Sequence, residues 1–146
     1  MLFRVSSLAS LVAMLGCGGP LGVLPGGRLS GESTAAPAVW DSVGNSGQIQ
    51  LETRPEDPYS VNINYTVVDA QMYANAGDTE TQWVKNLAAD PRARIRLGGR
   101  IYPVRAERVT DPGEMARFGK VWTSQGRFYR DPSELDPAFV YRLMPR

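Results

Sequence analysis

The sequence predicts a mainly β domain with helices (α+β), in which about six strands form an antiparallel sheet closed into a small barrel. Three observations favour this fold class. Several segments alternate polar and apolar residues, which is the period of a half-buried strand. Short turns join most of these segments, as in β-hairpins. Helical spacing of apolar residues occurs mainly in two places, without a strand–helix–strand rhythm, so helices are expected to pack at the openings of the barrel.

The first expected hairpins lie between residues 48 and 75. Residues 48–53 alternate polar and apolar side chains, and residues 54–58 end that strand with two prolines and acidic turn formers. The cleanest strand follows, with one face made of Tyr59, Val61, Ile63, Tyr65 and Val67. On its other face, Asn62 and Asn64 either line a polar pocket or form the outside of the strand. Asp69-Ala70 then makes a turn, and residues 71–75 return beside it.

A capped helix followed by a hairpin is expected between residues 79 and 109. Thr79 with Gln82 fits a capping box, and Asp78 is an alternative N-cap. The apolar stripe of this helix consists of Trp83, Val84, Leu87 and Ala88. Asp90-Pro91 ends it, because the residue before proline disfavours the α region. Residues 92–97 and 100–109 then form two strands around Gly98-Gly99, and Pro103 indicates an edge or a bulge in the second strand.

The last part of the chain predicts one more helix and one more strand. Asp111-Pro112 starts the helix as N-cap and first position, and its inward residues are Met115, Phe118 and Trp122. Residues 123–137 read as a polar loop with a second capping signal at Asp131-Pro132. Residues 139–144 alternate again, which predicts the final strand.

Composition bounds the function. A chain of 146 residues with 42% apolar residues holds one domain with a real core. The formal net charge is +1, so a bulk attraction to nucleic acid is not expected. The chain has no His, which removes Ser-His-Asp and Cys-His nucleophiles and the commonest metal ligand, and no metal is expected. Its single Cys rules out an intramolecular disulfide.

The first residues are typical of an export signal, predicted for residues 1–16. Arg4 precedes an apolar run over residues 8–15 that is too short for a permanent membrane span. Met14-Leu15-Gly16-Cys17 resembles the bacterial lipobox, in which the Cys is acylated. This predicts a membrane-anchored lipoprotein of the cell envelope, periplasmic or extracytoplasmic, with lipid bound through Cys17. An ordinary signal peptide, or a disordered start with an incidental Cys, is the alternative.

Residues 17–38 are rich in Gly, Pro, Ser and Ala and show no periodicity. This composition predicts a flexible tether. The folded domain is therefore expected to span residues 39–146.

Several motifs together resemble one family. They are Trp83-Val84-Lys85-Asn86-Leu87, then Asp90-Pro91 and Gly98-Gly99, and finally Val104 to Asp111. This order is similar to the deazaflavin-dependent nitroreductase-like proteins, within the wider pyridoxamine-phosphate-oxidase-like group of flavin-binding split β-barrels. The resemblance covers residues 47–146. It implies an antiparallel split barrel, a deazaflavin or FMN cofactor, and pairing into a homodimer.

The resemblance also implies where a cofactor would bind. The turn that holds phosphate in the family, Gly-Arg-x-Ser-Gly, reads here Arg54-Pro55-Glu56-Asp57-Pro58, so Arg54 remains but two carboxylates replace the small donors. The other candidates are the end of the preceding strand, the helix N-terminus with its free N–H groups, and the helix itself. The candidate cofactor-binding residues are Arg54, Asn75, Thr79, Thr81, Trp83, Lys85 and Asn86.

Each candidate also has a structural interpretation. Trp83 is equally a core anchor of its helix, and Lys85 is equally on a solvated face. Asn86 is a poor helix former, which indicates a specific side-chain contact of either kind. A basic row on the following hairpin, Arg92, Arg94, Arg96 and Arg100, is either a site for a phosphorylated cofactor or acidic lipid, or a solvated strand face.

Two functions follow from these observations. The first is a membrane-anchored flavin- or deazaflavin-dependent oxidoreductase, nitroreductase-like, that reduces a small electrophile. In such enzymes the cofactor supplies the hydride chemistry, so the absence of a catalytic acid–base cluster does not exclude the activity. The alternative is a non-catalytic split-barrel envelope lipoprotein that binds a ligand or a protein partner. The altered phosphate turn and the export signal favour the alternative, and the resemblance favours the first.

Overall fold

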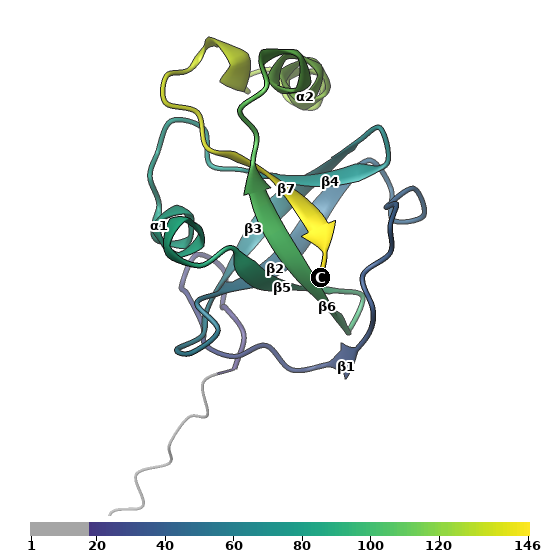
Figure 1. The fold of residues 1–146 in the computed structure, drawn as a ribbon, viewed down its shortest axis with the longest axis vertical. Helices are drawn as coiled ribbons and strands as arrows, with labels where there is room; N and C mark the ends of the chain where they lie inside the picture. The colour runs from purple at the N-terminus through teal and green to yellow at the C-terminus, as the bar shows by residue number, and fades with distance from the viewer. Residues whose placement is uncertain (1–17) are drawn as a thin grey trace, which may run out of the picture.

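The computed structural model describes residues 18–146 and contains a closed antiparallel barrel (Figure 1). Its six strands are β2 (Ser46–Thr53), β3 (Tyr59–Val68), β4 (Gln71–Asn75), β5 (Arg92–Leu97), β6 (Arg100–Arg108) and β7 (Val140–Pro145). Around the barrel they follow the order β6-β5-β2-β3-β4-β7, and the β6–β7 pairing closes it. A two-residue strand, β1 (Glu32–Ser33), adds to β6 in parallel. The predicted fold class is confirmed.

Tight turns close the two clearest hairpins. Gly98 and Gly99 have φ values of 57° and 77° between β5 and β6, as their sequence predicts. Asp69 and Ala70 form the tight turn between β3 and β4, with φ values of 51° and 62°. Pro103 faces Arg94 of β5, and on its other side β6 changes partner from β1 to β7. The proline therefore lies where it interrupts no ladder, as expected.

The helix α1 (Gln82–Ala89) begins two residues later than the sequence predicts. Thr81 is its N-cap, and no side chain caps it, so the Thr79–Gln82 capping box is wrong. The helix ends at Asp90, which is extended because Pro91 follows. Ala88 is exposed, and Asn86 takes its place among the buried residues, beside Trp83, Val84 and Leu87.

The helix α2 (Pro112–Ser124) lies at another side of the barrel from α1 (Figure 1). The Asp111 carboxylate accepts a hydrogen bond from the N–H of Glu114 at 2.8 Å, which is the predicted N-cap. Phe118 is buried under this helix with Val68, Tyr73, Val109 and Val140, and Met115 and Trp122 pack against that cluster. A short 3₁₀ turn (Pro132–Glu134) follows at the second capping signal.

Tyr73 couples the barrel to α2 and makes stability depend on alkaline pH. Its hydroxyl donates to the Glu114 carboxylate at 2.8 Å, and burial together with that acid raises the pKa of Tyr73 to about 12. Between pH 10 and 12 the unfolded chain loses this proton while the folded chain keeps it, so the unfolding free energy falls as pH rises. The fall attributable to Tyr73 is at most about 2–3 kcal/mol.

We expect Tyr73→Phe to flatten this dependence. Urea denaturation at pH 8 and at pH 11 should show a smaller loss of stability in the variant than in the wild type, although the variant also loses one hydrogen bond. Equal losses in the two proteins would contradict the assignment.

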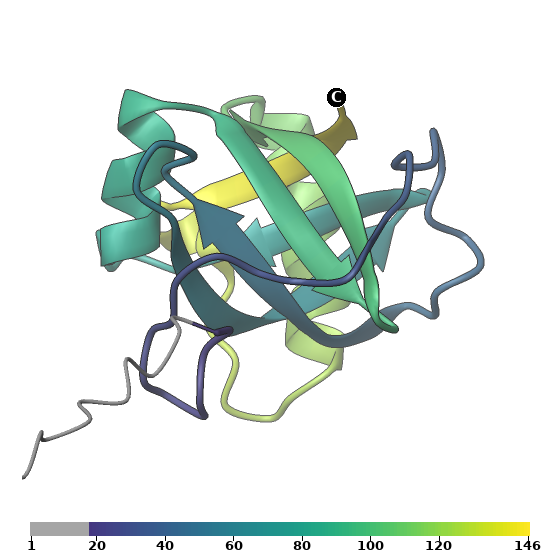
Figure 2. The same ribbon diagram turned by 90° about the horizontal axis from the view of Figure 1, so that it is seen from below.

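Residues 18–38 do not form the free tether that their composition predicts. This segment runs along the outside of the barrel (Figure 2). Within it, Leu29 is only 3% exposed. The N–H of Leu29 donates to the Glu52 carboxylate at 2.6 Å, and the N–H of Gly26 donates to the carbonyl of Ser60 at 2.9 Å. Contacts with distant strands, which composition does not reveal, hold the segment in place.

Candidate functional site

The residues predicted to bind a cofactor lie in three separate places. Asn75 is at the end of β4, Arg54 is in the β2–β3 turn, and the other five lie on or just before α1. A cavity of about 310 Å³ lies at the first of these places. It is lined by Asn75, Ala76, Gly77, Trp122, Phe128, Tyr129, Arg130 and Leu135.

One wall of this cavity is the backbone turn that follows β4. Asn75 Oδ1 accepts a hydrogen bond from the N–H of Gly77 at 2.8 Å, and Gly77 has a φ of 62°, which favours glycine. Ala76 and Gly77 are both hydrogen-bonded to Phe139, just before β7, at 2.9 and 2.7 Å. The turn is therefore held between two strands. It leaves the Nδ2 group of Asn75 as a donor beside the cavity.

The opposite wall is a stack of aromatic rings. Trp122 stacks on Phe118 at 6.1 Å and on Tyr129 at 4.4 Å, with interplanar angles of 18° and 19°. Phe128 is 88% exposed and Tyr129 is 40% exposed. Flat, accessible rings of this kind stack on planar aromatic ligands. Tyr129 also lines a neighbouring cavity of about 210 Å³ beside Asn64 and Tyr65, so Asn64 belongs to a polar pocket.

The charge at this cavity is balanced by one ion pair. Arg130 lines the cavity and lies 3.0 Å from the carboxylate of Asp78. No Asp or Glu lines it among the residues that the structure describes. The site can therefore orient a ligand by stacking and by hydrogen bonds, but it holds no carboxylate for general acid–base catalysis.

Two of the five candidates on or before α1, Trp83 and Asn86, pack that helix against the barrel. Trp83 is 5% exposed and meets the ring of Tyr141 edge-on at 5.8 Å. Asn86 donates to the Thr53 hydroxyl at 3.0 Å and accepts from Gln82 at 2.9 Å, so the predicted specific contact of its side chain joins α1 to β2. Thr79 and Lys85 are exposed. The hydroxyl of Thr81 is buried without a hydrogen-bond partner in the described part of the chain.

Arg54 is held within its own turn. It has a φ of 59°, its Nε donates to the carbonyl of Asp57 at 2.7 Å, and its guanidinium lies 3.2 Å from the Asp57 carboxylate. One of the two acids of this turn thus pairs with the arginine that the resemblance offers to a phosphate. Arg54 also lines a groove of about 430 Å³ between the turn and residues 18–27.

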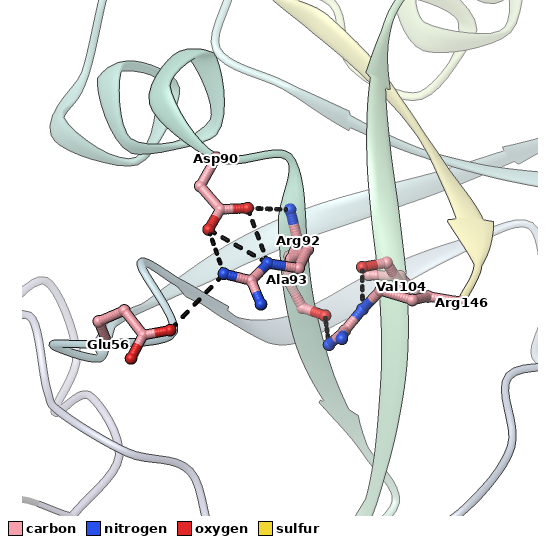
Figure 3. Close-up of polar contacts among 6 residues, drawn as sticks. All are labelled: Glu56, Asp90, Arg92, Ala93, Val104 and Arg146. Atoms are coloured by element: carbon pink, nitrogen blue, oxygen red, sulfur yellow. Dashed lines mark hydrogen bonds and ion pairs between the residues drawn. The ribbon is translucent and has the colours of Figure 1, made fainter.

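Most arginines of the basic row on the β5–β6 hairpin are bonded to neighbouring groups, as Figure 3 shows for Arg92. Arg92 binds Asp90 at 2.7 Å and lies 3.6 Å from Glu56, and the hydrogen bond from Arg92 lowers the pKa of Asp90 to about 2. Arg94 binds the buried Glu52 at 2.7 Å. Arg96 donates to Gln50 at 3.3 Å. Three of the four arginines are therefore engaged within the chain, which favours the structural interpretation of the row.

Sequence reasoning missed Phe128 and Tyr129, which it assigned to a polar loop. The available signal was two adjacent aromatic residues between Gly126 and Asp131-Pro132, because exposed aromatic pairs in loops are often binding residues. In residues 18–146 no helix has the length and apolar character to cross a membrane. In the same range, no group of three or more His, Cys, Asp or Glu residues is placed to hold a metal.

Several solved structures are similar to this fold. A candidate pyridoxamine 5′-phosphate oxidase from Listeria innocua superposes with a TM-score of 0.54 at 12% identity, over 68% of this chain and 83% of that one. A conserved hypothetical protein from Mycobacterium tuberculosis superposes with a TM-score of 0.56 at 21% identity, over 77% of this chain and 86% of that one. A FAD-binding protein from Mesorhizobium loti superposes with a TM-score of 0.50 at 19% identity, over 68% of this chain and 80% of that one. At these identities the similarity shows the split-barrel fold.

No curated protein matches the sequence. The F420H(2)-dependent quinone reductase family matches residues 60–133, just over half of the 146 residues. This range contains β3 to α2, and with them Asn75, Trp122 and Tyr129 of the cavity. The chain belongs to the F420H(2)-dependent quinone reductase family.

Proposed function

We propose that this protein is a reductase that uses a deazaflavin or flavin cofactor to reduce a small electrophile, such as a quinone or nitro compound. The observation that carries the proposal is the cavity between the Asn75–Gly77 turn and the Trp122–Tyr129 stack. Family membership supports it, because the family is named for reduced F420. A FAD-binding protein with the same fold supports it further.

The residues at the cavity fit a planar, polar-edged ring system. Its volume of about 310 Å³ is at the lower end for small-molecule sites, and Tyr129 lines both this cavity and the second one. Tyr129, which Trp122 supports from behind, would hold the face of a ring, and Asn75 Nδ2 would donate to an acceptor on its edge. The charge of Arg130 is already balanced by Asp78, so this pair adds no net charge for a ligand.

In this reaction the residues of the chain would position the cofactor and the electrophile. A bound deazaflavin or flavin supplies the hydride, and the protein orients the reacting faces. The aromatic wall excludes water from one side of the ring, and the hydrogen-bonded turn keeps the Asn75 amide at a constant place. A site without a carboxylate is suited to this chemistry, because hydride transfer needs alignment more than it needs an acid–base pair.

The experiment is a titration of the purified protein with F420 and with FMN, followed by cofactor fluorescence. We expect Tyr129→Ser to weaken binding about tenfold, since it removes an aromatic stack of about 1–1.5 kcal/mol. Tyr129→Phe keeps the ring and should bind nearly as the wild type does. Arg54→Ala tests the phosphate turn that the resemblance implies, and Lys85→Ala tests the candidate cofactor-binding residue on α1.

A wild-type protein that binds neither cofactor would overturn the reductase and favour the ligand-binding alternative. Binding that survives Tyr129→Ser but not Arg54→Ala or Lys85→Ala would move the site to the α1 side of the barrel.

We also propose that the protein is held at the cell envelope by acylated Cys17, and that it forms a homodimer. The support for the anchor is the Met14–Cys17 pattern after an apolar run. The signal sequence and Cys17 lie outside the described residues. Mass spectrometry of the protein expressed in a bacterium would detect the added acyl mass, and an unmodified Cys17 would exclude the anchor.

A further inference from the structure

We propose that residues 21–24 form a rigid apolar tip that inserts into the surface of a lipid bilayer. The tip is a hydrogen-bonded turn, in which the N–H of Leu21 donates to the carbonyl of Leu24 at 3.1 Å and the reverse bond is 2.9 Å. Its three apolar side chains point to solvent, with exposed fractions of 77% for Leu21, 98% for Val23 and 64% for Leu24. Adjacent apolar residues exposed to this degree mark an interaction surface.

The tip is built into the fold. The Asn62 side chain donates to the carbonyl of Gly22 at 2.9 Å, and Gly26 and Ser60 exchange backbone hydrogen bonds. The chain crosses itself closely behind the tip, where a Cβ on Gly26 would come within 2.4 Å of the Gly19 backbone. Glycine at residue 26 therefore allows the crossing. A tip held in this way pays little entropy when it inserts.

The chemistry around the tip favours a bilayer as the occupant. Residues 18–31 contain no Asp or Glu, and their one charge is Arg28, which is exposed and attracted to anionic lipid. The groove behind the tip is lined by Tyr59, a residue type that lies readily at a membrane–water interface, and by Arg54, whose charge is paired with Asp57. An acidic residue within the tip would oppose insertion, and residues 18–31 have none. The two acids of the neighbouring turn, Glu56 and Asp57, are paired with Arg92 and Arg54.

The place where the chain enters the fold supports the same occupant. The carbonyl of Gly18 accepts from the N–H of Gly27 at 3.0 Å, so the first described residue is fixed to the base of the tip. Cys17, whose acylation is proposed above, directly precedes Gly18 in the sequence. An acyl chain at Cys17 would therefore bring the tip to the same surface. The barrel would lie against the bilayer, with α2 and the loop that follows it at the far end (Figure 1).

The test follows the depth of single residues. The chain has one Cys, so in the full chain with Cys17→Ser, Val23→Cys carries the only thiol and can bear a polarity-sensitive bimane label. With vesicles of phosphatidylcholine and phosphatidylglycerol, we expect a blue shift of the label and a several-fold loss of quenching by aqueous iodide. Phe128→Cys, an exposed apolar position in the loop after α2, is the matched control and should stay quenchable.

Leu21→Ser with Leu24→Ser in the same labelled chain should abolish the protection of residue 23. A residue-23 label that stays fully quenchable on vesicle-bound protein would overturn the proposal, as would equal protection of residue 128. Protection that grows with protein concentration without vesicles would indicate a second copy of the chain and would also overturn it. Because every variant lacks Cys17, the result is independent of acylation and of the reductase activity.

Discussion

Replacing Glu52 with alanine is expected to lower the free energy of unfolding by about 3 kcal/mol. This carboxylate is 3% exposed and accepts three hydrogen bonds, two from Arg94 at 2.7 and 2.8 Å and one from the N–H of Leu29 at 2.6 Å. Alanine would leave the Arg94 guanidinium and the Leu29 N–H without their partner. The expected cost is at the low end for a broken buried pair, because the Arg94 side chain is 26% exposed and stays partly hydrated.

The matched control is Glu56→Ala on the same side of the molecule. Glu56 lies 3.6 Å from Arg92, but its side chain is 89% exposed, so its removal should change stability by less than about 1 kcal/mol. Urea denaturation followed by circular dichroism measures both variants. Limited proteolysis should also cut residues 18–38 faster in Glu52→Ala, since that segment is bonded to Glu52 through Leu29. Equal stability of the two variants would refute this account of Glu52.

Trp83→Ala is expected to lower the free energy of unfolding by about 3–5 kcal/mol. The indole is 5% exposed, belongs to the main core and packs against Tyr141, so alanine leaves a large cavity between α1 and the barrel. Trp83→Phe keeps a ring at this place and should cost clearly less. The measurement is chemical denaturation, combined with the F420 and FMN titrations.

This pair of variants separates the two interpretations of Trp83. If Trp83 is a core residue, the free energy of unfolding should fall in proportion to the side-chain volume removed, and Trp83→Phe should retain cofactor affinity. A cofactor contact predicts the opposite pattern, in which both variants denature near the wild-type urea concentration and bind cofactor weakly. Phe128→Ala is the comparison at an exposed aromatic position, where stability should hardly change.

Local signals in the sequence predicted most of the barrel correctly. The alternation in residues 59–67 places Tyr65 and Val67 in the core, and the Gly98-Gly99 pair forms the expected turn. Asp111 caps α2 as predicted, because an N-cap depends only on residues a turn away. The start of α1 was less predictable, since Asp78, Thr79 and Thr81 are all acceptable N-caps by type, and the helix begins after Thr81 without a side-chain cap.

The candidate site was only partly predictable. Asn75 was recognised at the end of its strand, whereas Trp122 was assigned to the core and Phe128 and Tyr129 to a loop. The cavity forms because the loop after α2 folds back over the turn after β4, about fifty residues earlier in the chain. No periodic pattern encodes the meeting of two irregular segments. The same reason hid the path of residues 18–38.

The sequence by itself therefore determined the six barrel strands, their tight turns, the N-cap of α2 and the family, since each depends on neighbouring residues or on the order of motifs within one stretch. Only the tertiary structure decided which polar groups pair. It joined Glu52 to Arg94 and Leu29, and it brought the aromatic stack to Asn75. These contacts depend on the closure of the barrel, which sets the distances between residues that are far apart in the chain.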